Sequence, residues 1–178
     1  MADFDTGYKI AVYASASGWT NLGNIYISDD AWASSAVPAT GYTTYVKVYD
    51  FDFSEIPDTA TILGAYVRVQ GHGQLASIIR VNNIYLLDTS GAAAGDNKGP
   101  ASYFSISDTN RDFGGSSDLW GNALTPAWVK HSNFGAILRL YNNAAKSYAG
   151  YIDHVQMGVV YEIPPTSTSG GVILIAWG

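Results

Sequence analysis

The sequence predicts an all-β fold, an antiparallel jelly-roll-like β-sandwich with a short C-terminal arm. Apolar residues recur at every second position in several segments, which is the period of a strand with one buried face. No convincing stretch places apolar residues at the three- and four-residue spacing of a helix. The 178 residues include 19 glycines and 13 tyrosines but only 13% charged residues. This composition favours aromatic-rich strands joined by tight turns.

Six segments show the alternation of a strand. They are YKIAVYAS from Tyr8, YTTYVKVYDFDF from Tyr42, ILGAYVRVQG from Ile62, ASIIRVNNIYLLD from Ala76, FGAILRLYN from Phe134 and YAGYIDHVQMGVVYEI from Tyr148. In the third segment the parity that we assign to the core comprises Leu63, Ala65, Val67 and Val69. In the last segment the residues that share one parity are Tyr151, Val155, Met157, Val159 and Tyr161.

The remaining segments are rich in turn-forming residues. Segments 88–100 and 107–126 are dense in Gly, Asp, Asn and Ser, and we interpret both as loops. One short helix is expected over 125–132, because Thr125 can cap it and Pro126 suits the first helical position. With no repeat of fixed period, an antiparallel two-sheet sandwich is the architecture that fits.

Two local motifs have a structural interpretation. In EIPDTATILG, Pro57 fixes φ and Asp58 can bond its own backbone, which predicts a corner between two strands. In GGSSDLWG, the glycines permit positive φ, and Trp120 is a large apolar residue that would close one end of the sandwich.

Charge and composition exclude several kinds of partner. The net charge of −6 and the absence of a run of Lys and Arg disfavour nucleic acid and anionic lipid. With no cysteine, disulfides and thiolate metal sites are excluded. The first residues lack the pattern of a secretory signal, and no apolar stretch approaches the roughly 20 residues that span a bilayer. We therefore expect synthesis in a cytoplasm and no membrane partner.

Four blocks of the sequence together resemble a known module. They are GWTNLGNIYISDDAWASS (18–35), FDFSEIPDTATILGAYVRVQG (51–71), FGGSSDLWGNALTPAWVKHSNFGAILRL (113–140) and YIDHVQMGVVYE (151–162). In this order they resemble the jelly-roll-like module of bacteriophage virion structural proteins, which also occurs in some bacterial surface proteins. The resemblance covers nearly the whole predicted domain.

The resemblance implies a non-enzymatic structural protein of a phage particle, located in the virion after synthesis in the host. We expect a capsid decoration, or cement, protein that binds the major capsid protein shell or other virion subunits. The resemblance also implies a homo-oligomer, with a trimer favoured. A tail-fibre or tail-tip component is an alternative, and a glycan-binding module for host attachment is another, because tyrosine-rich jelly rolls can stack sugars on exposed rings.

No catalytic set is predicted. Asp153 and His154 are neighbours in a strand, so their side chains should point to opposite faces. They therefore cannot act together as a histidine general base and the carboxylate that orients it. His72 and His131 have no partner at metal-ligand spacing, and we interpret them as non-catalytic. A glycosidase would need two carboxylates facing each other, and nothing in the sequence pairs them.

No cofactor or metal site is predicted either. Asp108, Asn110 and Asp112 alternate as in a calcium loop, but the glycine comes one position late and Leu119 stands where the bidentate Glu would be. We interpret this segment as an Asx-rich turn. The Asp29–Asp30 pair is interpreted as a solvated turn.

At this length the chain fits one domain, and we assign residues 1–163 to it. Residues 164–171 are then a linker and 172–178 an apolar arm. In a strand both faces of the arm would be apolar, so it needs cover on both sides. We expect it to dock on a neighbouring subunit; folding back onto its own sandwich is the alternative. The interface residues of the arm would be Val172, Ile173, Leu174, Ile175 and Trp177.

Overall fold

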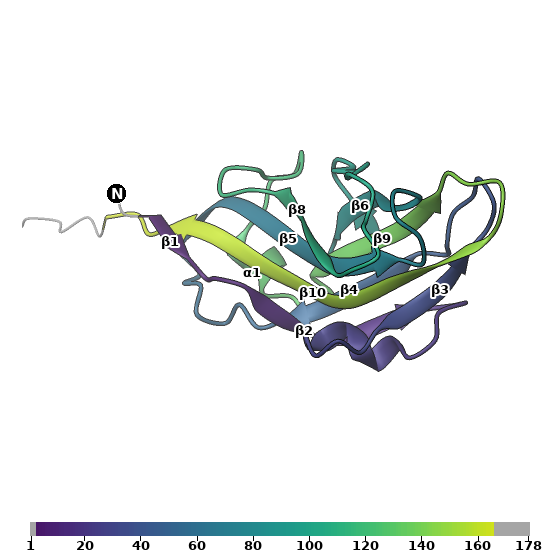
Figure 1. The fold of residues 1–178 in the computed structure, drawn as a ribbon. Coiled ribbons are helices and arrows are strands. Elements are labelled where there is room, and N and C mark those ends of the chain that lie inside the picture. The colour runs from purple at the N-terminus through teal and green to yellow at the C-terminus, as the bar shows by residue number, and fades with distance from the viewer. Residues whose placement is uncertain (1–2, 166–178) are drawn as a thin grey trace, which may run out of the picture.

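The computed structural model describes residues 3–165, which form two antiparallel sheets packed face to face (Figure 1). Its elements are β1 (Asp3–Asp5), β2 (Lys9–Ala16), the 3-10 helix η1 (Leu22–Tyr26), β3 (Ala33–Val37), β4 (Val46–Phe51), β5 (Thr61–Gly73), β6 (Ile79–Leu87), β7 (Ala93–Ala94), β8 (Thr109–Gly114), α1 (Pro126–Val129), β9 (Gly135–Asn142) and β10 (Tyr148–Glu162). The predicted all-β, antiparallel, jelly-roll-like class is confirmed.

The long strand β10 organises the first sheet. One of its edges pairs with β5, which pairs in turn with β8. Its other edge pairs in succession with β3, β2 and β1. The second sheet has the order β2, β4, β9, β6, β7. Strand β2 joins the two sheets, because Lys9 and Ile10 pair with β10 whereas residues from Ala11 to Ala16 pair with β4.

The core lies between the sheets and is built from the alternating residues of both. Fully buried aliphatic residues include Val48, Val67, Val81, Ile84, Leu138, Leu140, Val155 and Val159. The fully buried aromatic residues include Phe53, Phe104, Trp120 and Phe134. Burying side chains of this size contributes roughly 1.5–3 kcal/mol each, so packing alone can hold a chain that has no disulfide.

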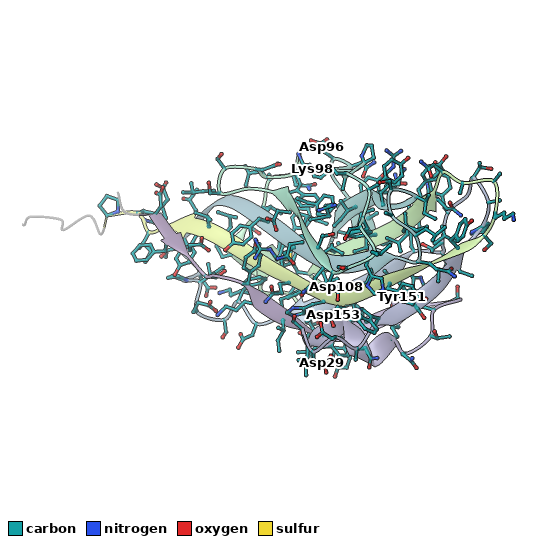
Figure 2. The ribbon with its side chains drawn as sticks, viewed as in Figure 1. Asp29, Asp96, Lys98, Asp108, Tyr151 and Asp153 are labelled. Carbon is teal, nitrogen blue, oxygen red and sulfur yellow. The ribbon has the colours of Figure 1, made fainter. Side chains whose placement is uncertain are left out.

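The buried position predicted for Trp120 is confirmed. Its indole is fully buried and its Nε1 donates to the backbone oxygen of Ala65 at 2.8 Å. Lys98 Nζ lies 5.9 Å from the ring centroid and forms ion pairs with Asp118 at 3.0 Å and Asp96 at 3.7 Å. Lys98 and Asp96 are labelled in Figure 2. These contacts join residues 96–98 to residues 118–120 beside the ring.

Two β-bulges change the predicted parity. The register of β5 against β10 slips where Gly64 pairs with Val160 and Ile62 with Tyr161, so Leu63 is an extra residue. The core position predicted for Leu63 is therefore wrong: Ile62 is buried and Leu63 is only half-buried. A second slip, between Ile152 and His154, makes Asp153 the extra residue of β10.

The expected helix is present as α1, with Thr125 Oγ1 accepting a hydrogen bond from the Trp128 backbone and Pro126 at its start. The interpretation of 107–126 as a loop is wrong for β8, and that of 88–100 is wrong for the two-residue β7. Strand β8 is polar because it lies at the edge of its sheet, and only Phe113 is buried.

Within residues 3–165, no helix has the length and apolar character needed to cross a membrane. Apart from Pro164 and Pro165, the linker and the arm lie outside the described residues. The predicted interface residues Val172, Ile173, Leu174, Ile175 and Trp177 are among them, and their docking stays a prediction.

Candidate functional site

Three aspartates from distant segments meet at the middle of β10. Asp30 precedes β3, Asp108 precedes β8, and Asp153 lies within β10. Each offers a carboxylate oxygen, and these oxygens lie within 4.8 Å of one another. Figure 2 labels Asp108 and Asp153 beside the β10 ribbon, with Asp29, the neighbour of Asp30, below them. We call these three residues the aspartate cluster.

The bulge in β10 places Asp153 in this cluster. Because Asp153 is the unpaired residue between Ile152 and His154, its side chain departs from strict alternation. Asp153 is fully buried, and its Oδ1 accepts a long hydrogen bond of 3.4 Å from the Asp29 backbone. Its Oδ2 is buried and has no hydrogen-bond partner among the described residues.

Aromatic side chains hold Asp108. The Trp32 indole Nε1 donates to Asp108 Oδ2 at 2.9 Å, and His72 Nδ1 lies 2.8 Å from Oδ1. His72 also stacks on Tyr151 with ring centroids 4.5 Å apart, and the edge of Trp32 meets the same His72 ring at 5.1 Å. The Asp108 carboxylate is thus fixed by two polar contacts, and both partner rings are locked by packing.

A turn before β3 presents the third carboxylate. The Asp29 side chain accepts from the Ala31 backbone at 3.1 Å, which is an Asx turn as the sequence indicates. Asp30 follows with a positive φ of 61° and an exposed side chain. Ser28, just before the turn, donates to Gln70 Oε1 at 2.8 Å and ties the turn to β5.

Three ionised carboxylates in the aspartate cluster would repel one another. Burial raises the pKa of the Asp153 carboxyl, and the nearby carboxylates of Asp108 and Asp29 raise it further, whereas the Asp29 backbone N–H and the Ser28 side chain act to lower it. Burial also lowers the pKa of the adjacent His154, whose Nε2 has no partner in the part of the chain that the structure describes. Both neighbours are therefore buried polar groups that are incompletely satisfied.

The remaining residues considered from the sequence lie elsewhere. Asp112 forms a two-point ion pair with Arg68, at 2.7 and 3.0 Å, so the alternating 108–112 pattern is a strand and the predicted Asx-rich turn is wrong. His131 Nδ1 accepts from the Asn133 backbone in the turn after α1. The sequence places Asp30, Asp108 and Asp153 in separate segments, and it did not predict that their side chains lie close together.

A second notable surface involves the N-terminal strands. Ten large hydrophobic side chains of the described chain are exposed, and half of them fall within residues 4–13: Phe4, Tyr8, Ile10, Val12 and Tyr13. Ile10 and Val12 are each more than half exposed and alternate with the buried Ala11. We call Ile10 and Val12, with the β2 backbone between them, the β2 apolar surface.

An open hollow of about 180 Å³ lies beside Tyr49, with Ser15, Lys47, Ser90 and Asn133 among its lining residues. Tyr13, on the neighbouring strand, stacks on Tyr49 with centroids 5.8 Å apart and planes 27° apart. This pair differs from the exposed Tyr42, whose ring is covered by the Arg139 guanidinium at 4.1 Å.

No protein-family model and no curated protein matches the chain. Among solved structures it is similar to CBM29_1, a family 29 carbohydrate-binding module from Piromyces equi, with a TM-score of 0.36 and 11% identity over 89% of this chain and 91% of that chain. It is also similar to the tobacco streak virus coat protein, with a TM-score of 0.32 and 12% identity over 98% and 95%. We base no functional argument on likenesses this distant.

Proposed function

We propose that this protein is a non-enzymatic structural protein of a bacteriophage particle, a decoration protein that binds the major capsid protein shell. The observation that carries the proposal is the β2 apolar surface, with Ile10 52% and Val12 55% exposed on a rigid sandwich. Exposed apolar groups on a strand mark a surface that other proteins can bury.

The edge of β2 adds to this surface. From Ala11 to Ala16, β2 pairs with β4 on one side, and no described strand pairs with its other edge, although η1 lies against β2. Where η1 leaves this edge open, its backbone N–H and C=O groups can accept a strand from another subunit. A flat charged edge would discourage such pairing, whereas an edge beside Ile10 and Val12 favours it.

The sequence resemblance also supports the proposal. The four blocks that resemble phage virion proteins contain η1, α1 and most of β3, β5, β9 and β10, so they include strands of both sheets.

In this function many weak contacts add together. A decoration protein present in many copies, or as the expected trimer, binds its shell through several β2 surfaces at once, so affinity rises without any strong single contact. The arm over 172–178 would add a second contact to a neighbouring subunit. The same surfaces would serve a tail-fibre or tail-tip component, which differs only in its position on the particle.

The test is the composition and map of purified particles of the phage that encodes the chain. We expect the protein in many copies on the head, in contact with the shell through β2. The double variant Ile10→Lys, Val12→Lys should stay folded and be lost from particles, whereas the control Ile106→Lys, at a side chain 65% exposed, should be retained. Density on the tail alone would overturn the decoration role, and absence from particles would overturn the proposal.

A second candidate function, glycan binding, is favoured by the Tyr13–Tyr49 pair beside the polar hollow. A sugar could place its apolar face on Tyr13 and its hydroxyls toward Ser15 and Ser90. A glycan array with the purified protein tests this. Binding should be lost in Tyr13→Ala and kept in the control Tyr42→Ala, whose ring already faces Arg139. An array without hits removes this candidate and leaves the decoration role in place.

A further inference from the structure

The aspartate cluster brings three carboxylates together without a counter-charge from a lysine or arginine. Their oxygens lie within 4.8 Å of one another. In the described part of the chain, the ion pairs of lysine and arginine are made with other acidic residues, and the one basic partner is His72, at Asp108. Like charges this close repel one another unless a proton or a cation neutralises them.

A second observation, independent of the clustering, indicates a missing ligand. Asp153 is fully buried, its Oδ2 has no hydrogen-bond partner in the described part of the chain, and its Oδ1 accepts a long hydrogen bond of 3.4 Å from the Asp29 backbone. Burying a polar atom without a partner is costly, and native structures rarely keep one unless a bound group completes it. The unpartnered carboxylate belongs to the residue that the β10 bulge places in the cluster.

The donors select the kind of cation. All three are carboxylate oxygens, which suit hard ions such as Ca²⁺ and Mg²⁺. Ca²⁺ takes several carboxylates in a flexible geometry, whereas Mg²⁺ demands a nearly ideal octahedron, keeps several waters and is usually bound by one or two carboxylates. Three carboxylates from three separate segments therefore favour Ca²⁺.

The surroundings suit such an ion. Trp32 and His72 each contact one oxygen of Asp108 and fix its orientation, an arrangement that commonly supports metal ligands. Asp30 is exposed and leaves one side open to solvent, so a hydrated ion can enter and keep some of its water. We propose that Asp30, Asp108 and Asp153 bind one Ca²⁺ ion, which ties the turn before β3 and the start of β8 to the middle of β10.

The test is calorimetric titration of the EDTA-treated, dialysed full chain with CaCl₂ at neutral pH. We expect one ion per chain and a rise in melting temperature with Ca²⁺, because a ligand that binds only the folded state stabilises it. Asp30→Asn should weaken binding at least tenfold and leave the ion-free fold intact, since Asp30 is exposed. The charge-matched control Asp3→Asn, on exposed β1, should bind as the unchanged protein does.

Terbium supplies a readout specific to this place. Tb³⁺ takes oxygen ligands as Ca²⁺ does and luminesces when an excited indole lies close to it, and Trp32 contacts Asp108 directly. We expect luminescence excited through tryptophan that Ca²⁺ displaces and that Asp30→Asn reduces. No calcium-dependent heat or melting shift, or equal affinity in the Asp30→Asn and Asp3→Asn variants, would overturn the proposal. Both outcomes are independent of whether the protein occurs on a particle.

Discussion

Trp120 and Ala65, which are 55 residues apart in the chain, are joined by a hydrogen bond of 2.8 Å from the indole Nε1 to the backbone oxygen. The bond connects the loop after β8 to the middle of β5, and the indole around it is fully buried. A side chain that both fills the core and carries a polar contact should be sensitive to truncation.

Trp120→Ala is therefore expected to lower the free energy of unfolding by about 3–5 kcal/mol, the usual cost of deleting a large buried aromatic. Trp120→Phe keeps most of the volume but loses the hydrogen bond to Ala65, so a smaller loss of about 1–2 kcal/mol is expected. Urea denaturation measures both. Ile27→Ala, at an exposed side chain, serves as the control and should change stability by less than about 0.5 kcal/mol. Equal stability of all three variants would show that the ring is not a core element.

A side chain at Gly158 is expected to displace the ring of Tyr66. It pairs directly with Tyr66 across β10 and β5, and a Cβ there would lie 2.2 Å from the Tyr66 ring. Gly158→Ala should displace that ring and its hydrogen bond to Asp5, at a cost of about 1–3 kcal/mol in urea denaturation. Gly115→Ala is the matched control, because a Cβ at Gly115 meets no atom within 4 Å. A Gly158→Ala protein as stable as this control would contradict the packing of Tyr66 over the strand.

The Arg68–Asp112 pair predicts an acid-dependent contribution to stability. The hydrogen bond from the Arg68 guanidinium, first among the causes, lowers the pKa of the Asp112 carboxyl below its usual range. Because the pKa of Asp112 is lower in the folded protein than in the unfolded chain, its ionisation stabilises the fold. This contribution is complete above the pKa of the unfolded chain, about 4, and is lost as the pH falls through the lower pKa of the folded protein. Because Asp112 is half exposed and solvent screens the ion pair, the contribution of the pair to the free energy of unfolding should be about 1 kcal/mol or less.

Asp112→Asn removes that contribution. Unfolding free energies from urea titrations at several pH values should show the variant less stable at pH 7 and converging with the unchanged protein in acid. Asp3→Asn, which loses an exposed carboxylate on β1, should run parallel to the unchanged protein throughout. A constant difference between the Asp112→Asn variant and the unchanged protein at every pH would refute the ionic origin.

Truncation after Glu162 tests the arm. If 172–178 docks on a neighbouring subunit, the truncated domain should melt at an unchanged temperature in dilute solution and fail to assemble or bind its particle. Replacing Ile173, Ile175 and Trp177 together by Ser keeps the chain length and should cause the same loss. Burial of the arm would contribute several kcal/mol, at roughly 1.5–3 kcal/mol for each large side chain less the cost of ordering. Loss of several kcal/mol of stability in the truncated domain would instead show that the segment folds onto its own sandwich.

Alternation is easiest to see in strands whose buried face carries large residues. In β4, β6 and β9 the inward residues are large and aliphatic, so their period of two is visible in the sequence. Strand β8 carries only one buried residue, Phe113, and β3 has only small residues and Val37, so neither shows that period. Edge strands that pair through their backbones leave little trace in side-chain pattern.

The aspartate cluster could not be predicted for a different reason. Asp30, Asp108 and Asp153 are far apart in sequence, and only the pairing of β10 with β3 and β5 brings their segments together. The opposite-face rule applied to Asp153 and His154 assumed a regular strand, but the bulge makes Asp153 an extra residue, and both side chains are buried. A bulge of one residue depends on the partner strand and is not visible in β10 alone.

The position of β10 in the chain has a consequence for synthesis. Its partners β1, β2, β3 and β5 all precede it, and its last residue, Glu162, pairs with Asp3 and Thr61. At translation rates of about 5–20 residues per second, the first strands wait on the order of ten seconds for this partner. During that time Lys9 and Ile10, which pair with β10, lack their partner strand. The emergence of β10 from the ribosome, and not local propensity, should then set the moment at which the first sheet closes, so the nascent chain should need chaperones most just before residue 162 emerges.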